Sequence, residues 1–276
     1  MPNTAPTERP PSHNTEAAPR SMILPVKVGV ALGCRRLAKL LQLPSLPARL
    51  DGRWVPVPTQ YWTGPRLSYE PHTARQFVSR LQPGDTFWDI GAHHGIWSSL
   101  ASNLVSSAGR VVAFEPSDAF RLLERSLGRR GNVALREEAV GSECGQATFH
   151  GQGTDATGSL SREVTALNED LHPAEVTSYT VPVTTLDTTL EAEGRAPDLV
   201  KIDVEGFELH VLRGGMRLLE EEKPEFIIEI HPTQMELCDT TPDELIALLE
   251  RVGYTTEVID RNPNSIYTIA ATPKAK

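Results

Sequence analysis

The sequence is poor in cysteine, in basic charge and in long apolar runs, and each shortage excludes a class of protein. Its three cysteines, Cys34, Cys144 and Cys238, are far apart and form no C-x-x-C pair. This usage argues against a disulfide framework or a zinc site and is typical of reduced thiols in a cytoplasmic protein. The net charge of −9 over 276 residues argues against a nucleic-acid binder, which needs a basic face for the phosphates.

No apolar run is long enough to cross a bilayer. Residues 22–34 are mostly apolar, but Pro25 interrupts them, and they fall short of the ~20 residues that a membrane span needs. Arg35 and Arg36 follow this run, whereas a signal peptide carries its positive charge before its apolar region. We therefore expect a cytoplasmic protein that is neither exported nor stably inserted in a membrane.

The first 66 residues differ in composition from the rest of the chain. Residues 1–21 contain five prolines and almost no large apolar side chain, which predicts a disordered leader. Residues 26–43 are interpreted as an amphipathic helix with a basic face, and we expect its leucines to be buried. The range 22–66 is therefore predicted to be a small helical cap or lid, with a dimer surface or a lipid-surface contact as alternatives. Residues 67–276 are long enough for one catalytic domain with a sizeable core.

From residue 81 onward, predicted strands and helices alternate. The predicted strands cover residues 86–90, 110–115, 133–140, 179–185, 198–203 and 225–230, and the predicted helices cover 95–106, 117–127, 206–220 and 242–252. The range 141–161 is interpreted as loops or a short hairpin, and 254–271 as a terminal hairpin. Such alternation predicts an α/β fold: a Rossmann-like doubly wound sheet, mostly parallel, closed by a C-terminal antiparallel hairpin.

Two short apolar runs each end in an acid and indicate a nucleoside-binding βαβ unit. The first is followed by the turn Asp89-Ile-Gly91-Ala-His-His-Gly95, and the second ends at Glu115. A helix N-terminus after a glycine turn offers free N–H groups, and an acid at the next strand tip can accept hydrogen bonds from ribose hydroxyls. The G-x-G-x-x-G pattern that makes room for a pyrophosphate is missing, which disfavours an NAD-dependent oxidoreductase.

Several sequence blocks follow one another in a fixed order: Tyr69-Glu70-Pro71, Pro83-Gly84-Asp85, Asp89–Gly95, Arg110–Pro116, Thr185-Leu186-Asp187, Lys201–Glu208, Leu212–Gly215 and Pro224–Glu229. Together they resemble the FkbM family of S-adenosylmethionine (SAM)-dependent methyltransferases. The resemblance covers residues 67–260 and implies a class I methyltransferase fold. It also implies SAM as the cofactor and O-methylation of a hydroxyl on a sugar, polyketide or other secondary metabolite.

The resemblance and the strand-tip positions together select the residues expected to bind SAM. These cofactor-binding candidates are Glu70, Asp89, Gly91, His93, Gly95, Glu115, Pro116, Ser117, Glu138 and Ala139. Ser117 is also the expected N-cap of the helix that follows it. One departure concerns His93, which stands where the family usually has Asn. His93 and His94 are adjacent, so we expect their side chains to diverge and to bind no metal.

The candidate catalytic residues are Asp203, Glu205, Glu229 and His231, at the ends of the predicted strands 198–203 and 225–230. Ligands of open α/β sheets bind at these strand ends. Asp203 and His231 are the candidate general bases, whereas Glu205 is a base or a helix cap. Asp203, Glu229 and His231 are alternatively the ligands of a Mg²⁺ ion. Lys201 is expected to pair with one of the acids, and Glu208 is expected to be structural.

Two other function classes stay open beside the methyltransferase. One is the NAD-dependent oxidoreductase, which would share the βαβ unit. The other is a non-catalytic SAM-binding protein, which would keep Asp89 and Glu115 but lose the acids at the end of the predicted strand 198–203. The expected partner is a small hydroxylated acceptor and not a nucleic acid, and a homo-oligomer is left open.

Overall fold

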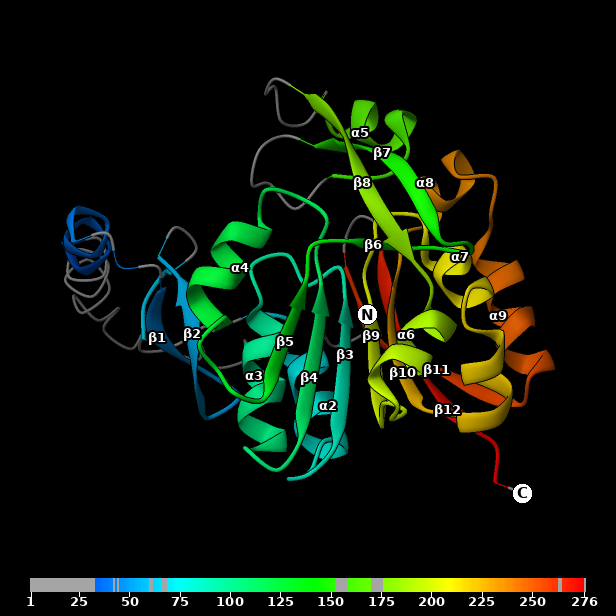
Figure 1. Ribbon diagram of the computed structural model, residues 1–276, viewed down its shortest axis with the longest axis horizontal. Helices are drawn as coiled ribbons and strands as arrows, with labels where there is room; N and C mark the ends of the chain where they lie inside the picture. Colours follow the sequence, from blue (N-terminus) through cyan, green and yellow to red (C-terminus); the bar gives the residue numbers. More distant parts are fainter. Residues whose placement is uncertain are drawn as a thin grey trace, which may run out of the picture.

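A mixed seven-stranded sheet forms the centre of the computed structural model, which describes residues 33–41, 43, 45–59, 62–65, 69–151, 158–169, 176–262 and 265–275. The strand order is β11-β12-β10-β9-β3-β4-β5, and β10, β9, β3, β4 and β5 run parallel (Figure 1). Their bounds are β3 Thr86–Ile90, β4 Arg110–Phe114, β5 Val133–Arg136, β9 Leu199–Ile202, β10 Glu225–Ile230, β11 Tyr254–Arg261 and β12 Tyr267–Pro273. The antiparallel pairing of β12 with β10 and β11 confirms the predicted terminal hairpin and the predicted fold class.

Helices cover both faces of this sheet. Residues alternate between the faces along β3: Phe87 belongs to a core with the helices α2 and α3, and Trp88 to a core with α6, α7 and α9. Since both faces are buried, the parallel strands are almost continuously apolar. The helix bounds are α2 Pro71–Arg80, α3 Ile96–Val105, α4 Phe120–Leu127, α5 Arg162–Glu169, α6 Leu186–Glu193, α7 Glu208–Arg213, α8 Pro232–Leu237 and α9 Pro242–Arg251.

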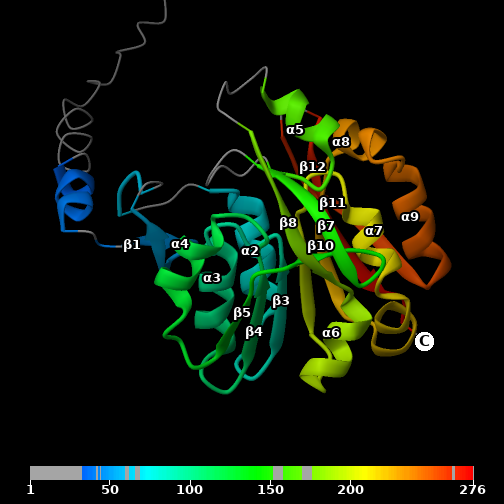
Figure 2. The ribbon, with the colours of Figure 1, turned by 45° about the horizontal axis from the view of Figure 1, so that its top comes forward.

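A second, three-stranded sheet lies beyond the C-terminal ends of the parallel strands (Figures 1 and 2). It consists of β6 (Ala139–Val140), β7 (Gly145–Gly151) and β8 (Thr177–Thr184), in the order β6-β8-β7. The prediction of one strand over 133–140 is therefore wrong, because the chain leaves the main sheet after β5 and pairs again through Ala139 and Val183. Two adjacent acids, Glu137 and Glu138, separate the two strands.

The predicted helix over 206–220 is also broken in two. The α-helix α7 ends at Arg213, and a π-helical turn, η1 (Leu218–Glu222), follows it. At the break, a Cβ atom on Gly214 would lie 2.1 Å from the carbonyl oxygen of Gly141. Close packing against the loop after β6 therefore requires glycine there, and the helix ends at that contact.

The N-terminal range contains a hairpin as well as a helix. Residues 33–40 are helical, but β1 (Ser45–Leu50) and β2 (Arg53–Pro58) pair antiparallel, so the helical prediction is wrong over 45–58. The Asp51-Gly52 pair forms the turn with φ of 44° and 78°, which is the usual Asp-Gly hairpin signal. The hairpin packs its Leu50 and Val55 into the core beside α2 and α3. The predicted leader, 1–21, lies outside the described residues.

In the described part of the chain, no helix has both the length and the apolar content needed to cross a membrane.

Candidate functional site

A cleft opens where the parallel strands end, between the main sheet and the small sheet. Its volume is about 960 Å³, counting the part that is open to solvent. The turns after β3, β4 and β9 form one side, and Phe149, Ser159 and Leu160 contribute from the small sheet and the loop beside it. Parallel strands bring their C-terminal ends to one edge, which is where ligands of such sheets bind.

The turn after β3 is shaped by contacts within the protein. Gly91 has φ 79°, and a Cβ atom there would lie 1.8 Å from the carbonyl oxygen of Asp203. Gly95 has φ 77°, and its Cβ would lie 2.4 Å from Leu123 of α4. Both glycines are therefore required by close packing of the chain against itself as well as by backbone conformation.

His93 lies in the same turn with φ 49°. Asn and His are among the non-glycine residues that adopt this left-handed conformation most readily, so both residue types suit the position. The prediction that His93 and His94 diverge is wrong, because their ring centroids lie 3.4 Å apart.

Glu115 connects the two turns that border the cleft. Its Oε2 accepts a hydrogen bond of 2.6 Å from the backbone N–H of His93, and its Oε1 accepts one of 2.9 Å from the N–H of Ser117. The residue is only 5% exposed and lines the cleft. Each carboxylate oxygen can accept a further hydrogen bond. Ser117 Oγ accepts a hydrogen bond from the N–H of Ala119 in the turn before α4. The N-cap of α4 is Ala119, so the prediction of Ser117 as the N-cap is wrong.

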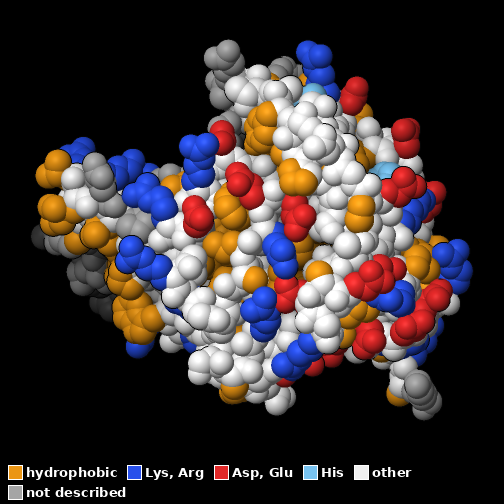
Figure 3. All heavy atoms as spheres, viewed as in Figure 1, with side chains coloured by type: hydrophobic (Ala, Val, Ile, Leu, Met, Phe, Trp, Pro, Cys, Tyr) orange, Lys and Arg blue, Asp and Glu red, His pale blue; other side chains and the backbone are white. Residues whose placement is uncertain are grey.

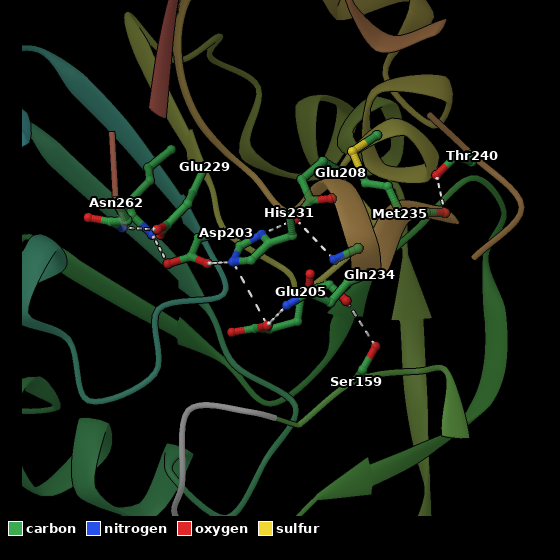
Figure 4. Close-up of polar contacts among 12 residues, drawn as sticks. Ser159, Asp203, Glu205, Glu208, Glu229, His231, Gln234, Met235, Thr240 and Asn262 are labelled. Atoms are coloured by element: carbon green, nitrogen blue, oxygen red, sulfur yellow. Dashed lines mark hydrogen bonds and ion pairs between the residues drawn. The ribbon is translucent and has the colours of Figure 1, made fainter. Parts of the chain in front are cut away.

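Five ionisable side chains gather at the ends of β9 and β10, and Figure 4 labels four of them, Asp203, Glu205, Glu208 and His231. Lys201 Nζ donates a 2.8 Å hydrogen bond to Asp203 Oδ2, which confirms the expected pairing. The Nε2 atom of His231 lies 3.9 Å from Asp203 Oδ1 and 3.8 Å from Glu205 Oε2. Its Nδ1 atom is 2.8 Å from Oε1 of Glu208, which is completely buried. Glu208 therefore fixes the orientation of the imidazole.

Burial and mutual charge set the protonation of this cluster. Burial opposes a charge on His231, yet the carboxylates of Glu205, Glu208 and Asp203 hold its pKa well above the usual value. Asp203 is also partly buried, but Lys201 and His231 lower its pKa, so it stays ionised at neutral pH. A protonated imidazole cannot accept a proton, which weakens the prediction of His231 as the base.

The two other acids behave differently from Asp203. Burial raises the pKa of Glu205 to about 7, near neutral pH. Burial and the charge of Asp203 raise the pKa of Glu229 to about 9, so this carboxyl keeps its proton and hydrogen-bonds to Asp203. Glu205 also has φ 50°, a conformation that costs energy outside glycine and is often found at functional sites.

The structure brings most of the predicted site residues to one cleft. The lining contains these predicted residues: Gly91, His93, Glu115, Pro116, Ser117, Glu138, Ala139, Asp203 and Glu205. His231 and Glu229 lie behind Asp203 and are not part of the lining. Gly95 begins α3, and Glu70 precedes α2 with φ 36°.

Asp89 lies beneath the turn and does not line the cleft. It is fully buried, and its Oδ2 accepts a 2.5 Å hydrogen bond from Ser98 Oγ. Burial raises the pKa of its carboxyl.

Other lining residues were not predicted. Tyr69 lies before α2 and contacts Trp97, with ring centroids 5.6 Å apart. Phe149 and Leu160 come from the stretch 141–161, which was interpreted as loops or a short hairpin. Only the placement of the small sheet over the strand ends brings this stretch to the cleft, and no local pattern in the sequence signals it.

A family model described as the methyltransferase FkbM domain matches residues 89–256, more than half of the chain. The chain belongs to this methyltransferase family. The matched range contains the turn after β3, Glu115 and the whole charged cluster. Membership disfavours the oxidoreductase alternative.

Individual proteins are similar to this FkbM-family chain over most of its length. The hexuronic acid methyltransferase AglP of Haloferax volcanii is 27% identical over 245 residues, 88% of this chain and 92% of that protein. Among solved structures, methyltransferase FkbM from Methylobacillus flagellatus aligns with a TM-score of 0.48 at 18% identity, over 70% of this chain and 44% of its own. A SAM-dependent O-methyltransferase from Thermotoga maritima aligns with a TM-score of 0.47 at 14% identity, over 87% of this chain and 82% of its own.

Proposed function

We propose that the protein transfers a methyl group from SAM to a hydroxyl oxygen of a sugar, with Glu205 as the general base. The observation that carries this proposal is the position of Glu205: it lines the cleft, and partial burial raises the pKa of its carboxyl to about 7. A general base works best when its pKa lies near the working pH, because it is then ionised and still basic enough to take a proton.

The chemistry of the cleft fits SAM as the donor. Glu115 has unused acceptor capacity for ribose hydroxyls, and Phe114, Pro116 and Val140 add apolar surface beside it. Glu138, between β5 and β6, and Ala139, in β6, line the cleft and suit the edge of an adenine ring. The donor, when bound, supplies a methyl group on a positively charged sulfonium.

The residues of the chain supply position and proton transfer. Orientation of two reactants in a fixed geometry is worth about 7–11 kcal/mol of the barrier. Glu205 takes the proton of the acceptor hydroxyl, and such a base adds roughly 10²–10⁴-fold to the rate. Asp203 and His231 set the charge around Glu205, since Asp203 is ionised and His231 is protonated.

A divalent cation is the second candidate for activating the hydroxyl. Ligand atoms of Asp203, Glu205 and His231 all lie within 4.8 Å of one another. Glu205 takes the place of Glu229, one of the predicted ligands, in this group. Binding of a cation would also require His231 to lose its proton.

The acceptor class comes from the similarity to a hexuronic acid methyltransferase. The direct test is methyl transfer from radiolabelled SAM to a panel of glycosides, with uronic acid glycosides beside their neutral sugar counterparts. Methylation of a hydroxyl supports the proposal. Donor binding with no turnover on any hydroxylated acceptor would instead favour a non-catalytic SAM-binding protein.

The base is tested with Glu205→Gln, which keeps the size of the side chain but cannot take a proton. We expect kcat to fall by roughly 10²–10⁴-fold while the affinity for SAM stays the same. Wild-type kcat should rise with pH through about 7, the pKa of Glu205. Glu236→Gln, on the exposed side of α8, is the control. Loss of wild-type activity in EDTA, with recovery in Mg²⁺, would contradict direct base catalysis by Glu205 and favour activation of the hydroxyl by the cation.

A further inference from the structure

The helix at residues 33–40 exposes its large apolar side chains and buries a small one. Leu37, Leu40 and Leu41 are 55%, 78% and 59% exposed, whereas Ala38 is only 2% exposed. Residues three and four apart lie on one face of a helix, so the three leucines form a common face. We name this group, together with Leu43, the leucine face. An ordinary surface helix turns such a face toward the core.

The helix is attached to the folded domain in this orientation. The backbone N–H of Leu43 donates to the carbonyl oxygen of Ala38 over 2.9 Å, which ends the helix. The hydroxyl of Thr59, directly after the hairpin, donates a 2.6 Å hydrogen bond to the carbonyl oxygen of Leu43. Helix and hairpin lie together at one end of the molecule (Figure 1).

Four basic residues, which we name the basic border, lie in the same segment as the leucine face. Residues 33–50 contain four basic residues, Arg35, Arg36, Lys39 and Arg49, and no acidic residue. The chain as a whole carries a net charge of −9, so this end of the protein has the opposite sign. Figure 3 shows apolar and basic side chains side by side over this end.

The hairpin adds an aromatic side chain to the same end. Trp54 of β2 is 51% exposed, and the guanidinium of Arg49 lies 5.2 Å from the centre of its ring. Trp is common at the boundary between lipid and water, because its ring is apolar and its N–H is polar. Leucines and a Trp flanked by Lys and Arg are typical of helices that lie in the plane of a membrane surface.

We propose that the leucine face and its basic border bind the surface of a membrane that contains anionic lipids. The apolar side chains would enter the boundary between headgroups and acyl chains, and the basic ones would contact phosphate or carboxylate headgroups. A second copy of the chain fits this surface less well. A twofold symmetric contact would place each basic border opposite its own copy, so like charges would repel.

The test is flotation of the full-length protein with vesicles of phosphatidylcholine alone and of phosphatidylcholine with 30% phosphatidylserine. We expect binding to the anionic vesicles that weakens as salt is raised. The variant Leu37→Ser/Leu40→Ser/Leu41→Ser should lose at least tenfold in binding. The variant Arg35→Gln/Arg36→Gln/Lys39→Gln should bind the anionic vesicles about a hundredfold more weakly, because each basic charge contributes roughly fivefold to the affinity.

The matched control is Leu167→Ser/Leu237→Ser, which removes two exposed leucines from α5 and α8. It should bind the vesicles like wild type. Thermal melting of every variant shows that the domain is folded. Equal binding by the triple leucine variant, or no binding by wild type, would overturn the proposal. A wild-type dimer that becomes a monomer in that variant, without vesicle binding, would assign the face to self-association instead.

Discussion

Replacing Glu115 with alanine should affect both the stability of the free protein and its affinity for SAM. The carboxylate accepts hydrogen bonds from the backbone N–H groups of His93 and Ser117, and it is 5% exposed. A hydrogen bond to a charged group is worth about 1.5–3 kcal/mol. Water that enters the space left by the side chain can satisfy part of the two N–H groups, which reduces the loss. We therefore expect the free energy of unfolding to fall by about 2–5 kcal/mol.

In addition, the affinity of the folded variant for SAM should fall by about ten- to a hundredfold, because two ribose hydroxyls lose their acceptor. Glu115→Gln is a second variant, which tests the two hydrogen bonds without removing the side chain. One carboxylate oxygen becomes an NH₂ group that faces a backbone N–H donor, so this variant should be destabilised although it keeps the shape of the side chain. Glu137→Ala, an exposed acid just beyond β5, is the control for removal of a charge.

Urea unfolding without ligand measures the stability, and calorimetry under conditions where each variant is folded measures the SAM affinity. An unfolding free energy equal to that of wild type would refute the inferred hydrogen bonds between the two turns. An unchanged affinity in a folded Glu115→Ala protein would refute the assignment of the donor site to this cleft.

Three further outcomes follow from the contacts around the cluster. The melting temperature of Glu229→Gln, relative to that of wild type, should rise between pH 6 and pH 9. The folded wild-type carboxyl keeps its proton up to about pH 9, so the free energy of unfolding of wild type falls by up to about 1.4 kcal/mol per pH unit above the unfolded pKa, whereas the variant has no such loss. An equal difference in melting temperature at both pH values would contradict this. Glu208→Gln should lower the pKa of His231, because one of the three carboxylates that raise this pKa becomes neutral. An NMR titration of the His231 ring measures the change, and an unchanged pKa would argue against the ion pair between His231 and Glu208. Gly91→Ala should lower the free energy of unfolding by at least about 1–2 kcal/mol through its backbone conformation alone, and by more through the clash with Asp203. Gly194→Ala is the control in thermal melts: it has φ 63° and no atom within contact distance, so it should show only the conformational loss.

The sequence predicted the elements whose signals are local. The run that becomes β3 ends in an acid and a glycine turn, and Glu115 follows β4 at the expected place. The terminal hairpin was found from its turn residues. The hairpin β1–β2 was missed although Asp51-Gly52 is a strong turn signal, because the leucines before it were interpreted as part of a buried helix.

The properties of the cluster depend on distances between segments that are far apart in the sequence. Glu205 and His231 are separated by a helix and a strand, and only the parallel pairing of β9 with β10 brings them within 3.8 Å. Their protonation then depends on burial and on Glu208, which was expected to be only structural. Residue types alone could therefore name the acids but could not rank Glu205 above Asp203 as a base.

The contact between Gly91 and Asp203 connects the two halves of the cleft. A Cβ atom on Gly91 would collide with the backbone of Asp203, so the turn after β3 and the turn after β9 are packed backbone against backbone. The first turn is hydrogen-bonded to Glu115, and the second begins the segment that holds Glu205. The turn that borders the proposed donor site and the turn that leads to the proposed base therefore meet at Gly91. A side chain at position 91 would push these two turns apart. We therefore expect Gly91→Ala to disturb the proposed donor site and the proposed base together, and not the donor site alone.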